Sequence, residues 1–343
     1  MRKRVVLHIG TFKTATTAMQ HYMYDNREAL LERGVMYPRV CSFRDTGHVV
    51  LPASLLRKCG RRVPFWLDVD READYYWERV AGEIAASDCH TAVLSTEHFS
   101  NFGQDDCAAS LAPLAREYLA DFDVTVLCYL RRPDHYLLSW YNQVVKMGEA
   151  LVPFEEYYRR ILRNGGFQLF QSRILDAWAE AVGMDGMSVH SFDAVRREGL
   201  DVVEHFLGEV GAGANVPPVS SHPANTSIDF KLMTPQLLRN ILMKSVKEGD
   251  DVVDLPAFLR LYGEYLRGID DDGLAELDVA GDLEEEIGVI SSRYLPVFER
   301  VCADPKSSAK FRKKCADILR GRQHHQANLL HTVMRSAGLN AAG

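Results

Sequence analysis

The sequence predicts an α/β protein with a parallel sheet flanked by helices and a helical portion at its C-terminal end. Over the first 210 residues, short runs rich in β-branched and apolar residues alternate with helical patterns, which is typical of βαβ units. The first of these runs passes through a threonine-rich turn directly into a helix. Beyond about residue 213 only helical patterns remain. Together these three observations favour one sheet followed by helices.

The sheet strands and the first helices can be placed from the pattern of apolar residues. A helix at residues 17–33 carries apolar residues at helical spacing and is ended by Gly34. Another is expected at 70–86, and a third begins near Pro133, since proline suits the first helical turn. The strands are expected at residues 5–9, 35–37, 92–96, 124–130 and 187–192.

Two regions follow from this organisation. Residues 1–212 are interpreted as an α/β core, and residues 213–343 as a helical C-terminal portion packed on that core. Pro217-Pro218 marks an extended connection between them. Residues 40–90 are less regular and are interpreted as an insertion in the core.

Composition excludes several classes of protein. The chain has 343 residues, enough for a full hydrophobic core, and its net charge of −7 argues against general nucleic-acid binding. The seven cysteines are scattered, so no metal site is predicted and reduced thiols in the cytoplasm are expected. The apolar run after the basic N-terminus is too short for a signal peptide, and no stretch is long enough to span a membrane. Homo-oligomers remain possible.

The turn after the first strand has the chemistry of a phosphate-binding loop. The N-terminus of a helix offers unpaired N–H groups and a partial positive charge, which favour an anion. A lysine adds a full charge, and hydroxyl groups can donate to phosphate oxygens. The loop therefore predicts a P-loop-type sheet, although it lacks the Gly-Lys-[Ser/Thr] ending of the common nucleotide loop. It comprises Gly10, Thr11, Phe12, Lys13, Thr14, Ala15, Thr16 and Thr17.

This loop resembles the 5′-phosphosulfate loop of PAPS-dependent sulfotransferases of the bacterial type. The usual form in that family is Thr-x-Lys-[Ser/Thr]-Gly-Thr-Thr, and the sequence departs from it at Ala15, where the family has glycine. A methyl group there is expected to tighten the loop or to demand a negative φ.

A second stretch, after the most apolar strand, carries the same resemblance. Arg131 ends that strand, and Ser139 follows eight residues later in Ser139-Trp140-Tyr141. In the family an arginine and a serine at this spacing bind the 3′-phosphate of the donor. An arginine fork and a serine hydroxyl suit a phosphate group. The resemblance covers about residues 5–210.

The resemblance implies a donor, a product and a reaction. PAPS would give its sulfuryl group to a hydroxyl or amine acceptor by in-line transfer, leaving PAP, with no metal required. Lys13 would stabilise the leaving phosphate, and Glu97, after the third strand, would be the base. Some members of the family use a histidine, so His98 and His48 remain candidates. The acceptor could be a small molecule, a lipid or a carbohydrate, and the insertion at 40–90 lies where the family binds it.

Two other functions remain open. An ATP- and Mg²⁺-dependent phosphotransferase would need Gly-Lys-[Ser/Thr] in the loop, which is missing, and an acidic metal ligand, which Glu97 could imitate. The second open function is that of a nucleotide-binding protein on the same fold that does not catalyse a reaction. Lys13 together with Glu97 favours an enzyme.

Overall fold

The computed structural model divides into two compact units, each built from separate stretches of the chain. The first unit contains Met1–Arg132, Phe170–Ala224 and Glu285–Val301, and the second contains Pro133–Leu169, Asn225–Glu284 and Cys302–Gly343. The predicted division into domains 1–212 and 213–343 stays a prediction. The structure describes residues 2–43, 46–61, 63, 66–103, 111, 114–166, 169–213, 216–217, 227–249, 251–325 and 335.

The first unit is built around a five-stranded sheet in the order β2-β3-β1-β4-β5. Every neighbouring pair is parallel, and β1 is central, with His8 opposite Ser95 of β3 and Leu127 of β4. The strands are β1 (Arg4–His8), β2 (Val35–Met36), β3 (Thr91–Ser95), β4 (Asp123–Leu130) and β5 (Met187–Ser191). The predicted α/β class and all five predicted strands are confirmed.

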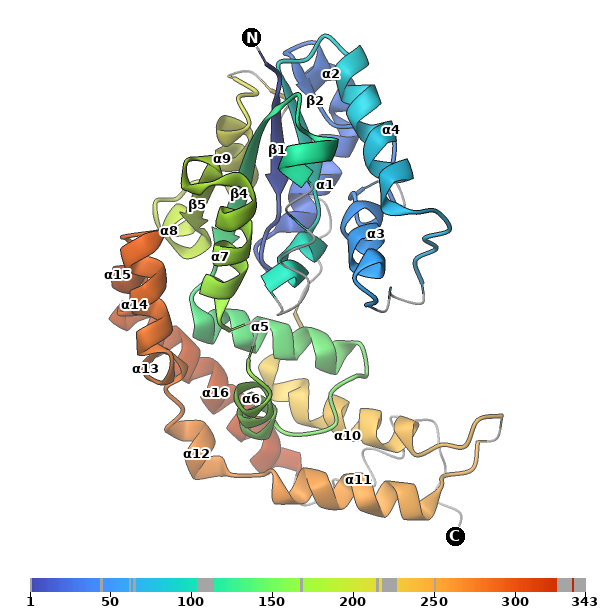
Figure 1. The fold of residues 1–343 in the computed structure, drawn as a ribbon. Helices are drawn as coiled ribbons and strands as arrows, with labels where there is room; N and C mark the ends of the chain where they lie inside the picture. Colours follow the sequence, from blue (N-terminus) through green and yellow to red (C-terminus); the bar gives the residue numbers. More distant parts are fainter. Residues whose placement is uncertain are drawn as a thin grey trace. The chain divides into compact units, whose positions relative to one another are not determined.

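Helices cover both faces of this sheet (Figure 1). On one face α1, α2, α8 and α9 pack on alternate strand residues such as Val6 and Tyr129. On the other, α4, α7 and the turn η1 bring Trp77, Trp178 and Phe99 together, and Trp178 donates to the Phe99 carbonyl. The helical elements of this unit, the last two each extending one residue beyond it, are α1 (Thr16–Asp25), α2 (Arg27–Leu31), α3 (Val50–Lys58), α4 (Ala73–Ala86), η1 (Glu97–Gly103), η3 (Leu114–Tyr118), α7 (Gln171–Val182), η4 (Met184–Gly186), α8 (Phe192–Arg197), α9 (Val202–Glu209), α14 (Glu284–Arg293) and α15 (Phe298–Cys302).

The helix predicted at 17–33 is two helices, α1 and α2, separated at Asn26. The backbone N–H of Asn26 and its side-chain amide both donate to the Tyr22 carbonyl, at 3.1 and 2.9 Å. Asparagine competes in this way with regular helical bonding, and the chain turns here before it continues. The apolar spacing carries across the break and therefore did not reveal it.

Among its described residues the second unit consists of helices and their connections, with one isolated antiparallel bridge between Val246 and Val253. Its centre holds a buried arginine, Arg322, that pairs with Glu155 at 2.6 Å and Asp271 at 3.0 Å. Both carboxylates are needed here, because a buried guanidinium without partners is costly. The elements are α5 (Pro133–Lys146), α6 (Phe154–Arg163), η5 (Phe230–Leu232), α10 (Met233–Lys244), α11 (Leu255–Arg267), α12 (Asp271–Ala275), α13 (Val279–Asp282) and α16 (Pro305–His325).

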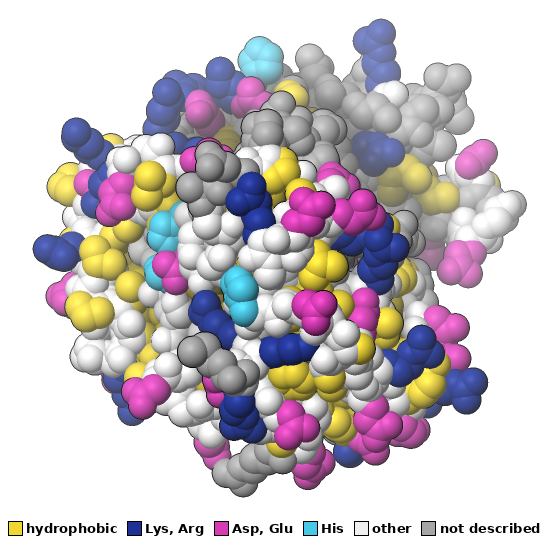
Figure 2. All heavy atoms as spheres, turned by 90° about the horizontal axis from the view of Figure 1, so that it is seen from above, with side chains coloured by type: hydrophobic (Ala, Val, Ile, Leu, Met, Phe, Trp, Pro, Cys, Tyr) yellow, Lys and Arg dark blue, Asp and Glu magenta, His cyan; other side chains and the backbone are white. Residues whose placement is uncertain are grey.

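Within the described part of the chain, no helix has the length and apolar character that crossing a membrane requires. On the face drawn in Figure 2, Lys and Arg side chains are mixed with Asp and Glu, and neither sign forms a continuous area.

Candidate functional site

The phosphate loop is held in shape by the neighbouring strand. Thr11 bonds the Tyr129 carbonyl of β4 twice, through its N–H at 3.4 Å and its hydroxyl at 3.0 Å. The Thr14 hydroxyl donates to the Thr11 carbonyl at 2.6 Å. Two of the four threonine hydroxyls therefore stabilise the loop, while Thr16 and Thr17 lie at the start of α1.

Gly10 is required at its position because the loop closes tightly over it. Its φ is +41°, and a methyl group there would lie 2.6 Å from Thr16 Oγ1. Thr16 Oγ1 and His8 Nε2 are both buried and have no hydrogen-bond partner among the described residues. Burial lowers the pKa of His8 to about 3, so the ring is neutral at pH 7. A buried hydroxyl without a partner at a helix N-terminus suits a ligand oxygen.

Lys13 and Ala15 both have positive φ, 69° and 65°. The expectation that Ala15 demands a negative φ is therefore wrong. Left-handed backbone costs a residue with a Cβ about 1–2 kcal/mol. The Ala15 methyl packs against the apolar core under α1, which offsets part of that cost.

Arg131 joins the second motif to the first. It follows β4, and its guanidinium donates to the Lys13 carbonyl at 3.0 Å while lying over the Phe192 ring. The adjacent Arg132 is fully buried and donates to the Val301 carbonyl, a structural contact. Ser139, the serine predicted to act with Arg131, is half-buried on α5 and belongs to the second unit.

Glu97 begins η1 and is separated from the end of β3 only by Thr96, as expected for a residue at the carboxyl edge of the sheet. Its Oε2 accepts a hydrogen bond from Gln20 Nε2 at 3.1 Å. Gln20 is 6% exposed and also donates to the Ser95 carbonyl, so α1 orients the carboxylate. The loops after β1, β3 and β4 therefore converge within the first unit.

The two candidate histidines occupy different environments. His98 lies between the rings of Phe12 and Trp66, with centroids 5.7 and 5.9 Å away, and burial lowers its pKa while nearby Glu97 opposes that shift. His48 is fully buried, and burial lowers its pKa to about 4. Its Nδ1 accepts from the Ser95 N–H at 3.2 Å, which leaves Nε2 to donate to the Pro38 carbonyl at 3.0 Å. Because both nitrogens are bonded to backbone, His48 is the weakest candidate base.

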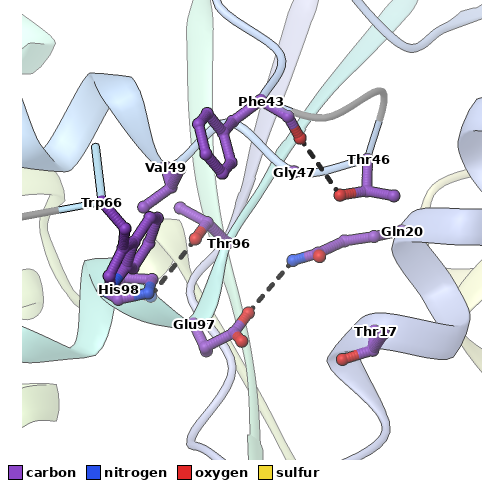
Figure 3. A pocket seen from close by; sticks show the side chains of 10 residues that line it. All are labelled: Thr17, Gln20, Phe43, Thr46, Gly47, Val49, Trp66, Thr96, Glu97 and His98. Carbon is purple, nitrogen blue, oxygen red and sulfur yellow. Dashed lines mark hydrogen bonds between the residues drawn. The ribbon is translucent and has the colours of Figure 1, made fainter. Parts of the chain in front are cut away.

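A cleft of about 450 Å³ opens beside Glu97 (Figure 3). Gln20 and Glu97 point toward one another across its floor, and Trp66 lies against His98. The sequence did not single out Gln20, although its spacing from Thr16 and Thr17 places it on the same helix face. Nothing in the sequence marked the aromatic residues of the wall. The lining is Thr17, Gln20, Phe43, Thr46, Gly47, Val49, Trp66, Thr96, Glu97 and His98.

Comparison with known proteins finds similarity among solved structures. No family model matches the sequence, and no curated protein matches it. Among solved structures, the chain is similar to a sulfotransferase from Alicyclobacillus acidocaldarius, with a TM-score of 0.44 and 15% sequence identity. The match covers 70% of this chain and 94% of that one.

Proposed function

We propose that the protein is a PAPS-dependent sulfotransferase. One observation carries the proposal: the Arg131 guanidinium bonds the Lys13 carbonyl, so two sequence motifs separated by more than a hundred residues meet at one edge of the sheet. Ligands of open α/β sheets bind at this edge. The buried Thr16 hydroxyl, with no partner among the described residues, supports an oxygen-rich ligand at the start of α1.

In the proposed reaction the acceptor oxygen or nitrogen attacks the donor sulfur in line. The bond from sulfur to the bridging oxygen breaks, and its electron pair goes to the 5′-phosphate of PAP. Lys13 stabilises that charge, and the Glu97 carboxylate takes the acceptor proton. Positioning and electrostatics then supply most of the rate, as in phosphoryl transfer. The reaction as written calls on no metal ion.

Within this proposal the remaining loop residues bind the donor. The hydroxyls of Thr16 and Thr17 and the N–H groups at the start of α1 would hold its 5′ phosphosulfate. Arg131 would hold its 3′-phosphate, and the predicted part of Ser139, which belongs to the second unit, stays a prediction. Thr11 and Thr14 keep the loop in shape from within.

The cleft beside Glu97 would receive the acceptor. Its wall of Phe43, Trp66 and His98 fits an apolar or flat face, and Gln20 and Thr46 can bond hydroxyl groups. A small molecule, a lipid and a carbohydrate all remain possible acceptors. Several lining residues fall between 40 and 90, the stretch interpreted as the acceptor side.

A phosphotransferase is the second candidate, because Glu97 follows β3 where an acidic metal ligand would lie. The Gln20 amide already bonds that carboxylate, which suits a base that must be aimed. A protein that binds the nucleotide without catalysis is the third.

Thermal unfolding with added nucleotides separates the sulfotransferase from the phosphotransferase, and transfer to an acceptor separates either enzyme from a protein that only binds the nucleotide. Adenosine 3′,5′-bisphosphate at a hundred times its dissociation constant adds about 2.7 kcal/mol to the folded state, which raises the midpoint by about 3 °C. We expect this rise in the wild type and its loss in Arg131→Ala and Lys13→Ala. If only ATP with Mg²⁺ raises the midpoint, the phosphotransferase is favoured. If neither nucleotide raises it, nucleotide binding is contradicted.

A further inference from the structure

Three side chains that can ligate metals lie together away from the cleft. One ring nitrogen from each of His190 and His205 and a carboxylate oxygen of Glu209 are all within 4.8 Å of one another. His190 lies on β5, and the other two lie four residues apart on α9, so they share one face of that helix. All three are half-buried in the first unit. We propose that they bind a divalent transition metal ion of the zinc class.

The set of ligands matches that class. Imidazole and carboxylate are common zinc ligands, and three protein ligands with an open fourth position form a recognised arrangement. His190 Nε2 and Glu209 Oε2 are 3.1 Å apart. Ligands 2.0–2.2 Å from a tetrahedral ion lie about 3.4 Å from each other. His190 and Glu209 are therefore already spaced for an ion, and the His205 nitrogen lies within 4.8 Å of both.

The surroundings of the cluster also fit a metal site. Metal-binding histidines usually donate their other ring N–H to an oxygen that fixes the ring. The Tyr129 hydroxyl lies 2.8 Å from His205 Nδ1, and Tyr129 on β4 is the register partner of His190. The Ser188 hydroxyl is 2.9 Å from His190 Nε2 and 3.3 Å from Glu209 Oε2, where it can donate a hydrogen bond to the carboxylate.

The cluster is joined to the phosphate loop through one residue. The Tyr129 side chain faces His205, while its carbonyl accepts both hydrogen bonds of Thr11. An ion that fixes His205 would therefore stabilise the strand end to which the loop is attached. The site is structural in this account, and sulfuryl transfer needs no ion from it.

The sequence did not predict this site. The search for metal ligands rested on cysteines, whereas these ligands are histidine and glutamate and come from two elements. His205 and Glu209 show the helical spacing, but His190 joins them only through the pairing of β5 with β4.

The test is a titration of chelator-treated protein with Zn²⁺ and, as a spectroscopic probe, Co²⁺. We expect one ion per chain, with His205→Gln and Glu209→Gln each weakening binding by about 100-fold or more, and Tyr129→Phe by about 10-fold. His324→Gln, at an exposed histidine of α16, is the matched control and should bind as the wild type does. Unfolding without metal checks that each variant is folded.

X-ray absorption on the wild-type zinc protein tests the proposal without any variant. The account predicts scattering from two imidazoles and from oxygen ligands around each ion. Absence of stoichiometric binding would overturn the proposal. So would a first shell with fewer than two imidazoles, or full affinity retained in both ligand variants.

Discussion

The proposed donor and acceptor sites are built in different ways. Under the proposed function, the donor side comes from eight consecutive residues, 10–17, together with Arg131, and its shape is set by hydrogen bonds to the Tyr129 carbonyl and from the Arg131 guanidinium. The acceptor side is assembled from α1, from the stretch around Phe43 and Trp66, and from the end of β3. The donor side is thus a local structure that a short motif can encode, whereas the acceptor side exists only once the chain has folded.

The largest expected effect lies on the donor side. Lys13→Ala should lower kcat/KM by about 10³-fold, because the leaving phosphate loses its cation. Affinity for adenosine 3′,5′-bisphosphate should fall as well. Lys244→Ala, at an exposed lysine of α10, is the control and should change neither quantity. Steady-state kinetics and calorimetry would measure the two effects, and unchanged kinetics in Lys13→Ala would contradict the role.

The next effect separates the two sides. Glu97→Gln should lower kcat by about 10²-fold through loss of the base, while bisphosphate affinity stays at the wild-type value. Gln20→Met should lower kcat by about 10-fold, since it removes the bond that orients the carboxylate. Glu180→Gln, at an exposed glutamate of α7, serves as the control. If Glu97→Gln changes only the affinity for the donor, Glu97 binds the donor and is not the base.

The free energy of unfolding should depend on pH through His48, whose ring bonds the backbone of Pro38 and Ser95 next to the proposed acceptor side. Its folded pKa of about 4 lies below the ordinary 6.5, so from pH 6.5 down to 4 the unfolded state takes up the proton first. Stability therefore falls as the pH falls through this window, by at most about 3 kcal/mol from this group. Urea unfolding at several pH values should show a shallower dependence in His48→Gln. If His48→Gln shows the same pH dependence of the free energy of unfolding as the wild type, His48 is not the group responsible.

The smallest effect concerns the loop backbone. Ala15→Gly removes the left-handed strain, but it also loses a packed methyl group and gives the unfolded chain more freedom. These contributions oppose each other, so the free energy of unfolding should change by less than about 1 kcal/mol. Urea unfolding measures it. A gain or loss above about 2 kcal/mol would mean that the balance described here is wrong.

The same contrast explains what the sequence could predict. The five strands, the loop and the strand-end positions of Arg131 and Glu97 followed from local patterns, since apolar runs and turn residues report on their own neighbourhood. The helix break at Asn26 did not, because the apolar spacing continues through it. The aromatic wall also could not be predicted, because Phe43 meets Trp66, and Trp66 meets His98, only through tertiary packing.

Transfer from labelled PAPS tests the central claim most directly. The protein would be incubated with PAPS labelled in its sulfuryl group and a panel of sugars, lipids, phenols and small amines, and PAP and labelled product would be measured. The account predicts acceptor-dependent formation of both by the wild type, and about 100-fold less by Glu97→Gln, which still binds the bisphosphate. Binding of PAPS without transfer to any acceptor, or phosphoryl transfer from ATP with Mg²⁺, would contradict it.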